Sequence, residues 1–204
     1  MSYEYDIFIS YRRNPETLGW INDHFEPLLS LRVELELQRR PKIYIDKQME
    51  SGAAWPAALG AALGQSRMLI ALWTGNYLAS VWCTEELSQM LGREKEAKLR
   101  TAAKPNGLIL PVFIHDGDSF PPDLAYIQPF QIQSSFNPRM ARNSQRAEEL
   151  DAALSAQAPA IAHSIQSAPA WRKEWPTNSA AAFYKRFYRH AKSVQTSVPR
   201  FTSR

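Results

Sequence analysis

Short β-branched and aromatic runs alternate along the chain with longer stretches that carry apolar residues at helical spacing. Residues 5–10 form one such run, and residues 68–73 are wholly apolar, which is typical of a strand buried on both faces of a parallel sheet. Further strands are predicted over residues 42–45, 108–114 and 130–132, with the last at a sheet edge.

Helices are predicted between these strands. Apolar side chains at helical spacing begin near Leu18, and Pro27 must either kink this helix or begin a second one. Residues 31–37 alternate apolar and polar side chains as a strand does, but we interpret them as helical. Three further helices are predicted: one beginning at Pro56, one over residues 82–98 and one over residues 142–165.

Strands that alternate with helices in this way indicate βαβ units. The sequence therefore predicts an α/β fold, a flavodoxin-like three-layer sandwich with a central parallel sheet of about five strands. Ligands of such sheets bind beyond the carboxyl ends of the strands. Four segments follow those ends: residues 10–14, 46–55, 73–86 and 115–119.

Charge is distributed unevenly. Residues 1–170 hold 16 basic and 19 acidic side chains, whereas residues 171–204 hold eight basic and one acidic. We therefore predict a domain over residues 1–170 and a basic C-terminal extension over residues 171–204, in which residues 180–192 form an amphipathic helix. Direct nucleic-acid binding by the domain is not expected, and for the extension we favour docking on the domain over contact with a membrane.

The composition excludes several classes of protein. Of the 204 residues, 45% are hydrophobic and 22% are charged, which is ordinary for a globular protein. The longest wholly apolar run has six residues, whereas a membrane-spanning helix needs roughly 20. Two acids precede the first apolar run, unlike a signal peptide, so we expect a cytoplasmic protein. Cys83 is the single cysteine and the four histidines are scattered, so neither a disulfide nor a metal site is predicted.

The loop after the first strand holds arginines where nucleotide-binding folds hold glycines. Residues 10–15 contain no glycine, which excludes a Rossmann dehydrogenase and a P-loop protein. Arg12 and Arg13 suit a phosphate or a carboxylate, although two solvated surface arginines are an equally good interpretation.

The start of the predicted helix over residues 82–98 places an aromatic ring near two carboxylates. Glu86 lies one turn after Trp82 and shares its face, whereas Glu85 is rotated away by about 100°. Taken alone, two first-turn acids that favour the positive helix end are the better interpretation. Cys83 is interpreted as a small buried hydrophobe, because no histidine lies near it in the sequence.

Together these motifs resemble the signature of the Toll/interleukin-receptor (TIR) domain family. Residues 6–13 resemble its first-strand box, residues 44–55 its second strand and BB loop, and residues 71–86 its third strand and tryptophan-containing third helix. With residues 110–122, which continue the pattern, the resemblance covers residues 3–136 and is greatest to bacterial members.

One departure from the family lies at Trp73 and Thr74, where Ser-Pro is usual. We expect these two residues to reshape the rim of the cleft.

The resemblance implies an enzyme. Many TIR domains cleave NAD+ between nicotinamide and ribose, and their key glutamate, four residues after the tryptophan, corresponds to Glu86. NAD+ is then the substrate, no cofactor is required, and the product is ADP-ribose or a cyclic isomer, in bacterial antiphage defence. Other members of the family are non-catalytic interaction modules, and this is the alternative function.

The resemblance also implies how substrate is held. Trp82 and Tyr11 would form a wall for nicotinamide, while Arg12 or Arg13 would hold the pyrophosphate. The remaining implied substrate-binding residues are Ser10, Asp46 and Trp55, the last two on the loop that would close over substrate. The expected protein contacts are self-association through this BB loop, residues 46–55, and an activating or effector partner protein.

Overall fold

A computed structural model of the chain describes residues 2–46, 57–115, 120–173 and 175. Most of the BB loop, including Trp55, and the predicted helix over residues 180–192 lie outside the described residues, so the predictions for them stay predictions.

The centre of the fold is a five-stranded sheet in the order β2-β1-β3-β4-β5, with every neighbouring pair parallel. This confirms the predicted flavodoxin-like arrangement, and every predicted strand is present. The strands are β1 (Tyr5–Tyr11), β2 (Ile43–Ile45), β3 (Ser66–Trp73), β4 (Ile109–Phe113) and β5 (Phe130–Gln131).

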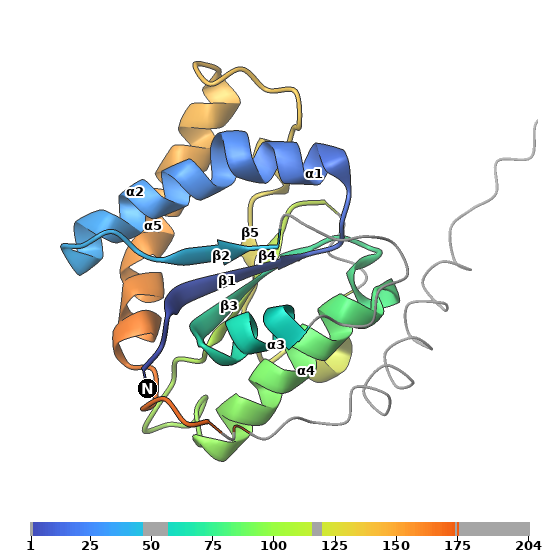
Figure 1. The fold of residues 1–204 in the computed structure, drawn as a ribbon. Coiled ribbons are helices and arrows are strands. Elements are labelled where there is room, and N and C mark those ends of the chain that lie inside the picture. The colour runs from blue at the N-terminus through green and yellow to red at the C-terminus, as the bar shows by residue number, and fades with distance from the viewer. Residues whose placement is uncertain (1, 47–56, 116–119, 174, 176–204) are drawn as a thin grey trace, which may run out of the picture.

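Helices cover both faces of this sheet. Figure 1 shows α1, α2 and α5 on one side of the sheet and α3 and α4 on the other, which makes three layers. The α-helices are α1 (Pro15–Trp20), α2 (Glu26–Leu37), α3 (Ala57–Gly64), α4 (Val81–Glu96) and α5 (Gln145–Gln166). A π-helical segment, η1 (Ile21–Phe25), joins α1 to α2. The described residues also form three 3-10 turns: η2 (Tyr77–Ala79), η3 (Pro122–Leu124) and η4 (Gln133–Ser135).

The first helix begins earlier than the apolar spacing predicts. The side chain of Asn14 caps α1 by accepting a hydrogen bond from the backbone N–H of Glu16 at 2.8 Å, and Pro15 occupies the first turn. Pro27 lies in the first turn of α2, directly after the π-helical segment η1, and helical backbone continues from α1 through η1 into α2.

Residues 31–37 are helical, as interpreted. Leu29 and Val33, one turn apart on α2, are fully buried, whereas Leu31 is 48% exposed and Leu35 is 62% exposed. Burial therefore follows the helical period. Leu31 and Leu35, which belong to the apparent alternation, lie on the exposed face of the helix.

The order of strands explains where a site can form. The chain passes from β1 to β2 on one side and then to β3 on the other side of β1, so strand order reverses between β1 and β3. Ser10 and Tyr11 pair with Ala71 and Leu72, which brings the carboxyl ends of both strands to the same edge. Ligand sites of open α/β sheets lie at such a reversal.

A buried carboxylate fixes α4 to β4 at the opposite end of the sheet. Glu94 accepts hydrogen bonds from the backbone N–H groups of Leu108 and Ile109 and from the guanidinium of Arg100. Because a buried charge is tolerated only when it is paired, these hydrogen bonds fix the position of α4 relative to β4.

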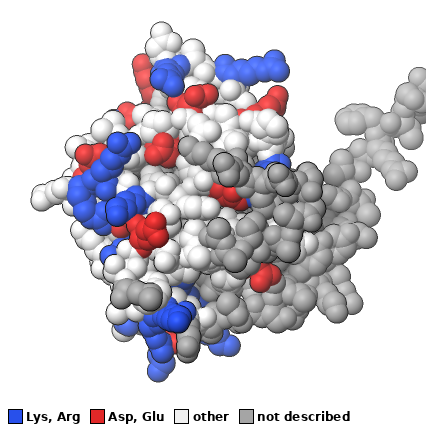
Figure 2. Space-filling model, in the orientation of Figure 1, with Lys and Arg blue, Asp and Glu red and all other residues white. Residues whose placement is uncertain are grey.

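The surface of the described domain carries charges of both signs. Figure 2 shows basic and acidic side chains interspersed on the face that it presents. No helix in the described part of the chain is long and apolar enough to cross a membrane.

Candidate active site

A cavity of about 500 Å³ opens at the reversal of strand order, between the carboxyl end of β1 and the start of α4. This volume is typical of small-molecule sites. Seven of the eight predicted site residues line it: Ser10, Tyr11, Arg12, Arg13, Asp46, Trp82 and Glu86. Trp55, the eighth, lies outside the described residues.

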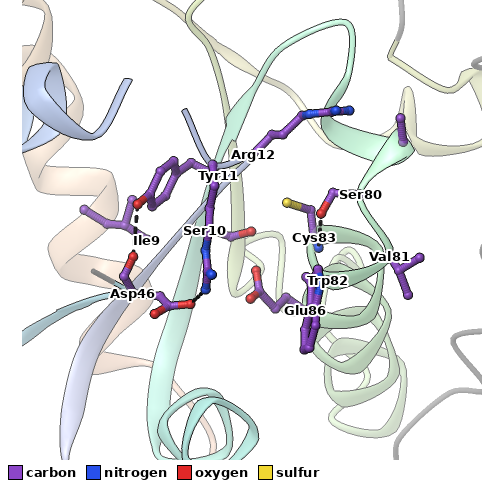
Figure 3. Close-up of a pocket in the computed structure, with 12 residues that line it drawn as sticks. Ile9, Ser10, Tyr11, Arg12, Asp46, Ser80, Val81, Trp82, Cys83 and Glu86 are labelled. Carbon is purple, nitrogen blue, oxygen red and sulfur yellow. Dashed lines mark hydrogen bonds and ion pairs between the residues drawn. The ribbon is translucent and has the colours of Figure 1, made fainter. Parts of the chain in front are cut away.

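The start of α4 determines which acid faces the cavity. Ser80 caps the helix through its hydroxyl, which accepts a hydrogen bond from the backbone N–H of Cys83. Because α4 begins at Val81, no acid lies in its first turn, and the interpretation of Glu85 and Glu86 as first-turn acids is wrong. Glu86 lines the cavity beside Trp82, as Figure 3 shows, whereas Glu85 is not among the lining residues.

Glu86 is a buried acid. Its residue is only 5% exposed, and burial raises the pKa of its carboxyl to about 7, well above the ordinary value of 4.5. The Ser10 hydroxyl and the positive charge of Arg13 counteract only part of this rise. Among the salt bridges of the described residues, none involves Glu86. The carboxyl is therefore poised to change charge near neutral pH.

The two arginines at the end of β1 have different partners. Arg13 forms an ion pair with Asp46, while Arg12 donates a hydrogen bond to the backbone oxygen of Asn76 at 3.1 Å. Both line the cavity with much of their residue surface exposed. Their charged groups therefore border the cavity in which Glu86 lies.

Tyr11 and Trp82 lie on different sides of Glu86, as Figure 3 shows. The Tyr11 hydroxyl donates to the backbone oxygen of Asp46 at 3.0 Å, and the residue is 7% exposed. Trp82 lines the cavity one helical turn before Glu86. Thus the aromatic ring that lies beside the acid belongs to Trp82.

Cys83 is buried as expected. It is 2% exposed, and burial raises the pKa of its thiol to about 12. The thiolate needed for nucleophilic attack is thus strongly disfavoured at neutral pH.

A family model described as the TIR domain matches residues 7–150. The chain belongs to the TIR domain family. It is 27% identical over 111 residues to the disease resistance protein RUN1 of Vitis rotundifolia, over 54% of this chain and 7% of RUN1.

The TIR domains in the structure of the activated Roq1 resistosome, which directly recognizes the pathogen effector XopQ, also align with this TIR domain. The alignment covers 91% of this chain and 98% of that chain, with a TM-score of 0.37 and 16% identity.

The expectation that Trp73 and Thr74 reshape the rim of the cavity is not met by direct contact, because neither residue is among the cavity-lining residues. Trp73 ends β3 with 1% of its residue exposed and is not among the cavity-lining residues. It stacks on Tyr77 with ring centroids 4.6 Å apart, and Phe120 contacts it edge-on at 4.8 Å. Its role in this TIR domain is packing beneath the site.

Tyr77 is a residue near the site that the sequence reasoning missed. Its hydroxyl lies 2.6 Å from the hydroxyl of Ser10 in a buried hydrogen bond. The only signal in the sequence is a tyrosine in the segment between the third strand and the following helix.

Proposed function

We propose that this TIR domain cleaves NAD+ between nicotinamide and ribose. The observation that carries the proposal is the buried carboxyl of Glu86, which lacks a salt bridge within the described residues and lines a cavity between Trp82 and the arginine-bearing end of β1. The resemblance to NAD-cleaving TIR domains at the same residue supports it.

The chemistry needs a negative charge at this position. When the bond between the nicotinamide nitrogen and C1′ of ribose breaks, its electron pair leaves with nicotinamide and the ribose develops the character of an oxocarbenium cation. The Glu86 carboxylate would stabilise this cation electrostatically. The leaving group already carries a positive charge, so a single carboxylate suffices and no acid need protonate it.

The ribosyl carbon is then captured by a nucleophile. Attack by water gives ADP-ribose and releases one proton, whereas attack by a group of the same nucleotide gives a cyclic isomer. The products therefore distinguish the two reactions, and we propose the hydrolase and the cyclase as outcomes of one site.

Other lining residues fit the remaining parts of this substrate. The Trp82 ring beside Glu86 suits the flat nicotinamide, and the exposed guanidinium of Arg12 suits the pyrophosphate. Arg13 would reach a phosphate only by exchanging or sharing its ion pair with Asp46.

We propose further that the site is completed by self-association through the BB loop, residues 46–55. Specific activity should then rise with protein concentration. Specific activity that is constant from dilute to concentrated protein would overturn this part of the proposal without affecting the catalytic role of Glu86.

The test is chromatography of the products formed from NAD+ by concentrated protein and by two matched variants. Nicotinamide release is expected from the wild type and from Glu85→Ala but not from Glu86→Ala. A bacterial defence role would then require that Glu86→Ala abolish protection of cells against phage. No release by wild-type protein, even when crowded on beads, would overturn the enzyme and favour a TIR interaction module.

A further inference from the structure

The hydroxyl of Tyr77 is hydrogen-bonded to Ser10, which lines the cavity with the candidate catalytic acid, although Tyr77 itself does not line the cavity. The residue lies in η2, between β3 and α4, and is fully buried. Its oxygen is 2.6 Å from the Ser10 hydroxyl oxygen, and Ser10 belongs to β1 and lines the cavity with Glu86. Tyr77 is therefore linked by a hydrogen bond to a residue that shares the cavity with Glu86.

Packing holds the Tyr77 ring in place. Trp73 stacks on it at 4.6 Å with an interplanar angle of 28°, and Phe120 supports Trp73 from an edge-on position. Fully buried aromatic rings have few alternative rotamers in a close-packed interior. The position of the phenol oxygen is thus set by the core and does not depend on a bound ligand.

The direction of the hydrogen bonds follows from the number of hydrogens. Each hydroxyl has one hydrogen to donate, and an ionised carboxylate can only accept. Burial raises the pKa of Tyr77 well above its ordinary value, so the phenol keeps its hydrogen at neutral pH. If Tyr77 donates to Ser10, the Ser10 hydrogen is free for Glu86; if Ser10 donates to Tyr77, Glu86 loses this donor.

The neighbouring groups favour the first arrangement. The Ser10 hydroxyl lines the cavity with both Glu86 and Cys83 and lowers the pKa of each, but sulfur is a much weaker acceptor than a carboxylate. Donation by Tyr77 therefore satisfies both hydroxyls and directs the Ser10 hydrogen to the charged group. Several titratable groups interact electrostatically with the Glu86 carboxyl. They are Arg13 on the loop after β1, Tyr11 on β1, Tyr44 on β2, Tyr77 on η2 and Cys83 on α4.

We propose that Tyr77 is a positioning residue for Glu86: it donates its hydrogen bond to Ser10 and so commits the Ser10 hydroxyl to stabilising the Glu86 carboxylate. The inference rests on the proposed function, because Glu86 acts as a carboxylate in that reaction. Trp73 contributes by holding the Tyr77 ring.

The test is titration of Glu86 by ¹³C NMR in full-length protein labelled at its glutamate carboxyls, with Glu86→Gln assigning the signal. Ser10→Ala should raise the midpoint of this titration by about one pH unit, since hydrogen bonds to charged groups are worth about 1.5–3 kcal/mol. Tyr77→Phe keeps the ring and should raise the midpoint by a smaller amount, about half a pH unit. In the Ser10→Ala background, Tyr77→Phe should add no further shift.

Turnover supplies the second readout. The acidic limb of the kcat/KM profile, which reports groups of the free enzyme, should move to higher pH in Tyr77→Phe by the same amount as the NMR midpoint, while KM at the plateau of the profile stays unchanged. Tyr5→Phe is the control, because it removes a hydroxyl at the opposite end of β1 and should move neither midpoint.

The outcomes distinguish a positioning role of Tyr77 from a merely structural one. A Tyr77→Phe protein that is less stable but titrates Glu86 as the wild type does would show a merely structural tyrosine and overturn the inference. A further shift in the Ser10→Ala background would overturn the route through Ser10. The NMR titration needs no turnover, so a shifted midpoint without NAD+ cleavage would retain the effect of Tyr77 on Glu86 and overturn only the proposed function.

Discussion

The burial of Glu86 should make the protein less stable as its carboxyl ionises. The pKa of Glu86 is about 7 in the folded chain, against an ordinary value of 4.5. Between these two values the folded state binds more protons than the unfolded state, so the free energy of unfolding falls as pH rises. The effect is complete above pH 7 and absent below pH 4.5.

The magnitude follows from the same two values. Each pKa unit corresponds to about 1.4 kcal/mol, so ionisation of Glu86 costs the fold about 3 kcal/mol at about pH 8 and about 1.4 kcal/mol at about pH 5.5. Glu86→Gln keeps the shape of the side chain and removes the charge. It should therefore raise the free energy of unfolding by about 3 kcal/mol at the higher pH, and this advantage should shrink by about half at the lower pH.

Urea unfolding followed by circular dichroism at both pH values measures this difference. Glu85→Gln, one residue away and half-buried outside the cavity, is the matched control and should give a smaller change. A Glu86→Gln protein that is no more stable than the wild type, or whose advantage is the same at both pH values, would refute a buried carboxyl that ionises near neutrality.

Substitutions at three further positions test how the surrounding fold is held, and urea unfolding at neutral pH measures each. Gly107→Ala places a Cβ against Glu94 and its guanidinium partner, so it should cost about 2 kcal/mol, and an unchanged midpoint would refute this packing. Ser80→Ala removes the cap of α4 and should cost about 1 kcal/mol, whereas Ser80→Thr should retain most of it. Asp6 is a buried acceptor for two arginine–carboxylate hydrogen bonds, so Asp6→Asn should cost about 2 kcal/mol. Burial raises the pKa of Asp6, but the hydrogen bonds to its carboxylate outweigh burial and bring the pKa below its ordinary value. The loss in free energy of unfolding caused by Asp6→Asn should therefore disappear as pH falls through that lowered pKa.

The architecture was accessible from the sequence because its signals are local. Residues 68–73 of β3 form a continuous apolar run, and the predicted face shared by Trp82 and Glu86 depends only on helical geometry. The beginning of α1 was missed although its signal is also local, since Asn14 before Pro15 is a typical helix start. Apolar periodicity alone places helix ends poorly, because the capping residues are polar.

The contacts that tune the site were not accessible, because they join distant segments. Ser10 and Tyr77 are separated by 67 positions, and they meet only because β1 and β3 pair with Ser10 opposite Ala71. The ion pair of Arg13 with Asp46 likewise depends on the pairing of β1 with β2 in the sheet. Single-chain patterns predict strands but not their register, so they could not supply either partner.

The division of charges around the cavity explains why Glu86 remains unpaired within the described residues. Arg13 is the positive group that lowers the pKa of Glu86, yet its ion pair is with Asp46. The helix dipole stabilises an acid most in the first turn of a helix. Because α4 begins at Val81, Glu86 lies beyond that turn. The neutral hydroxyl of Ser10 remains as the nearby stabilising group, and hydroxyls lower a carboxyl pKa less than a paired guanidinium does. A carboxylate left in this state destabilises the fold when ionised, and it gains most from a cation that enters the cavity, which is the charge that develops on the ribose in the proposed reaction.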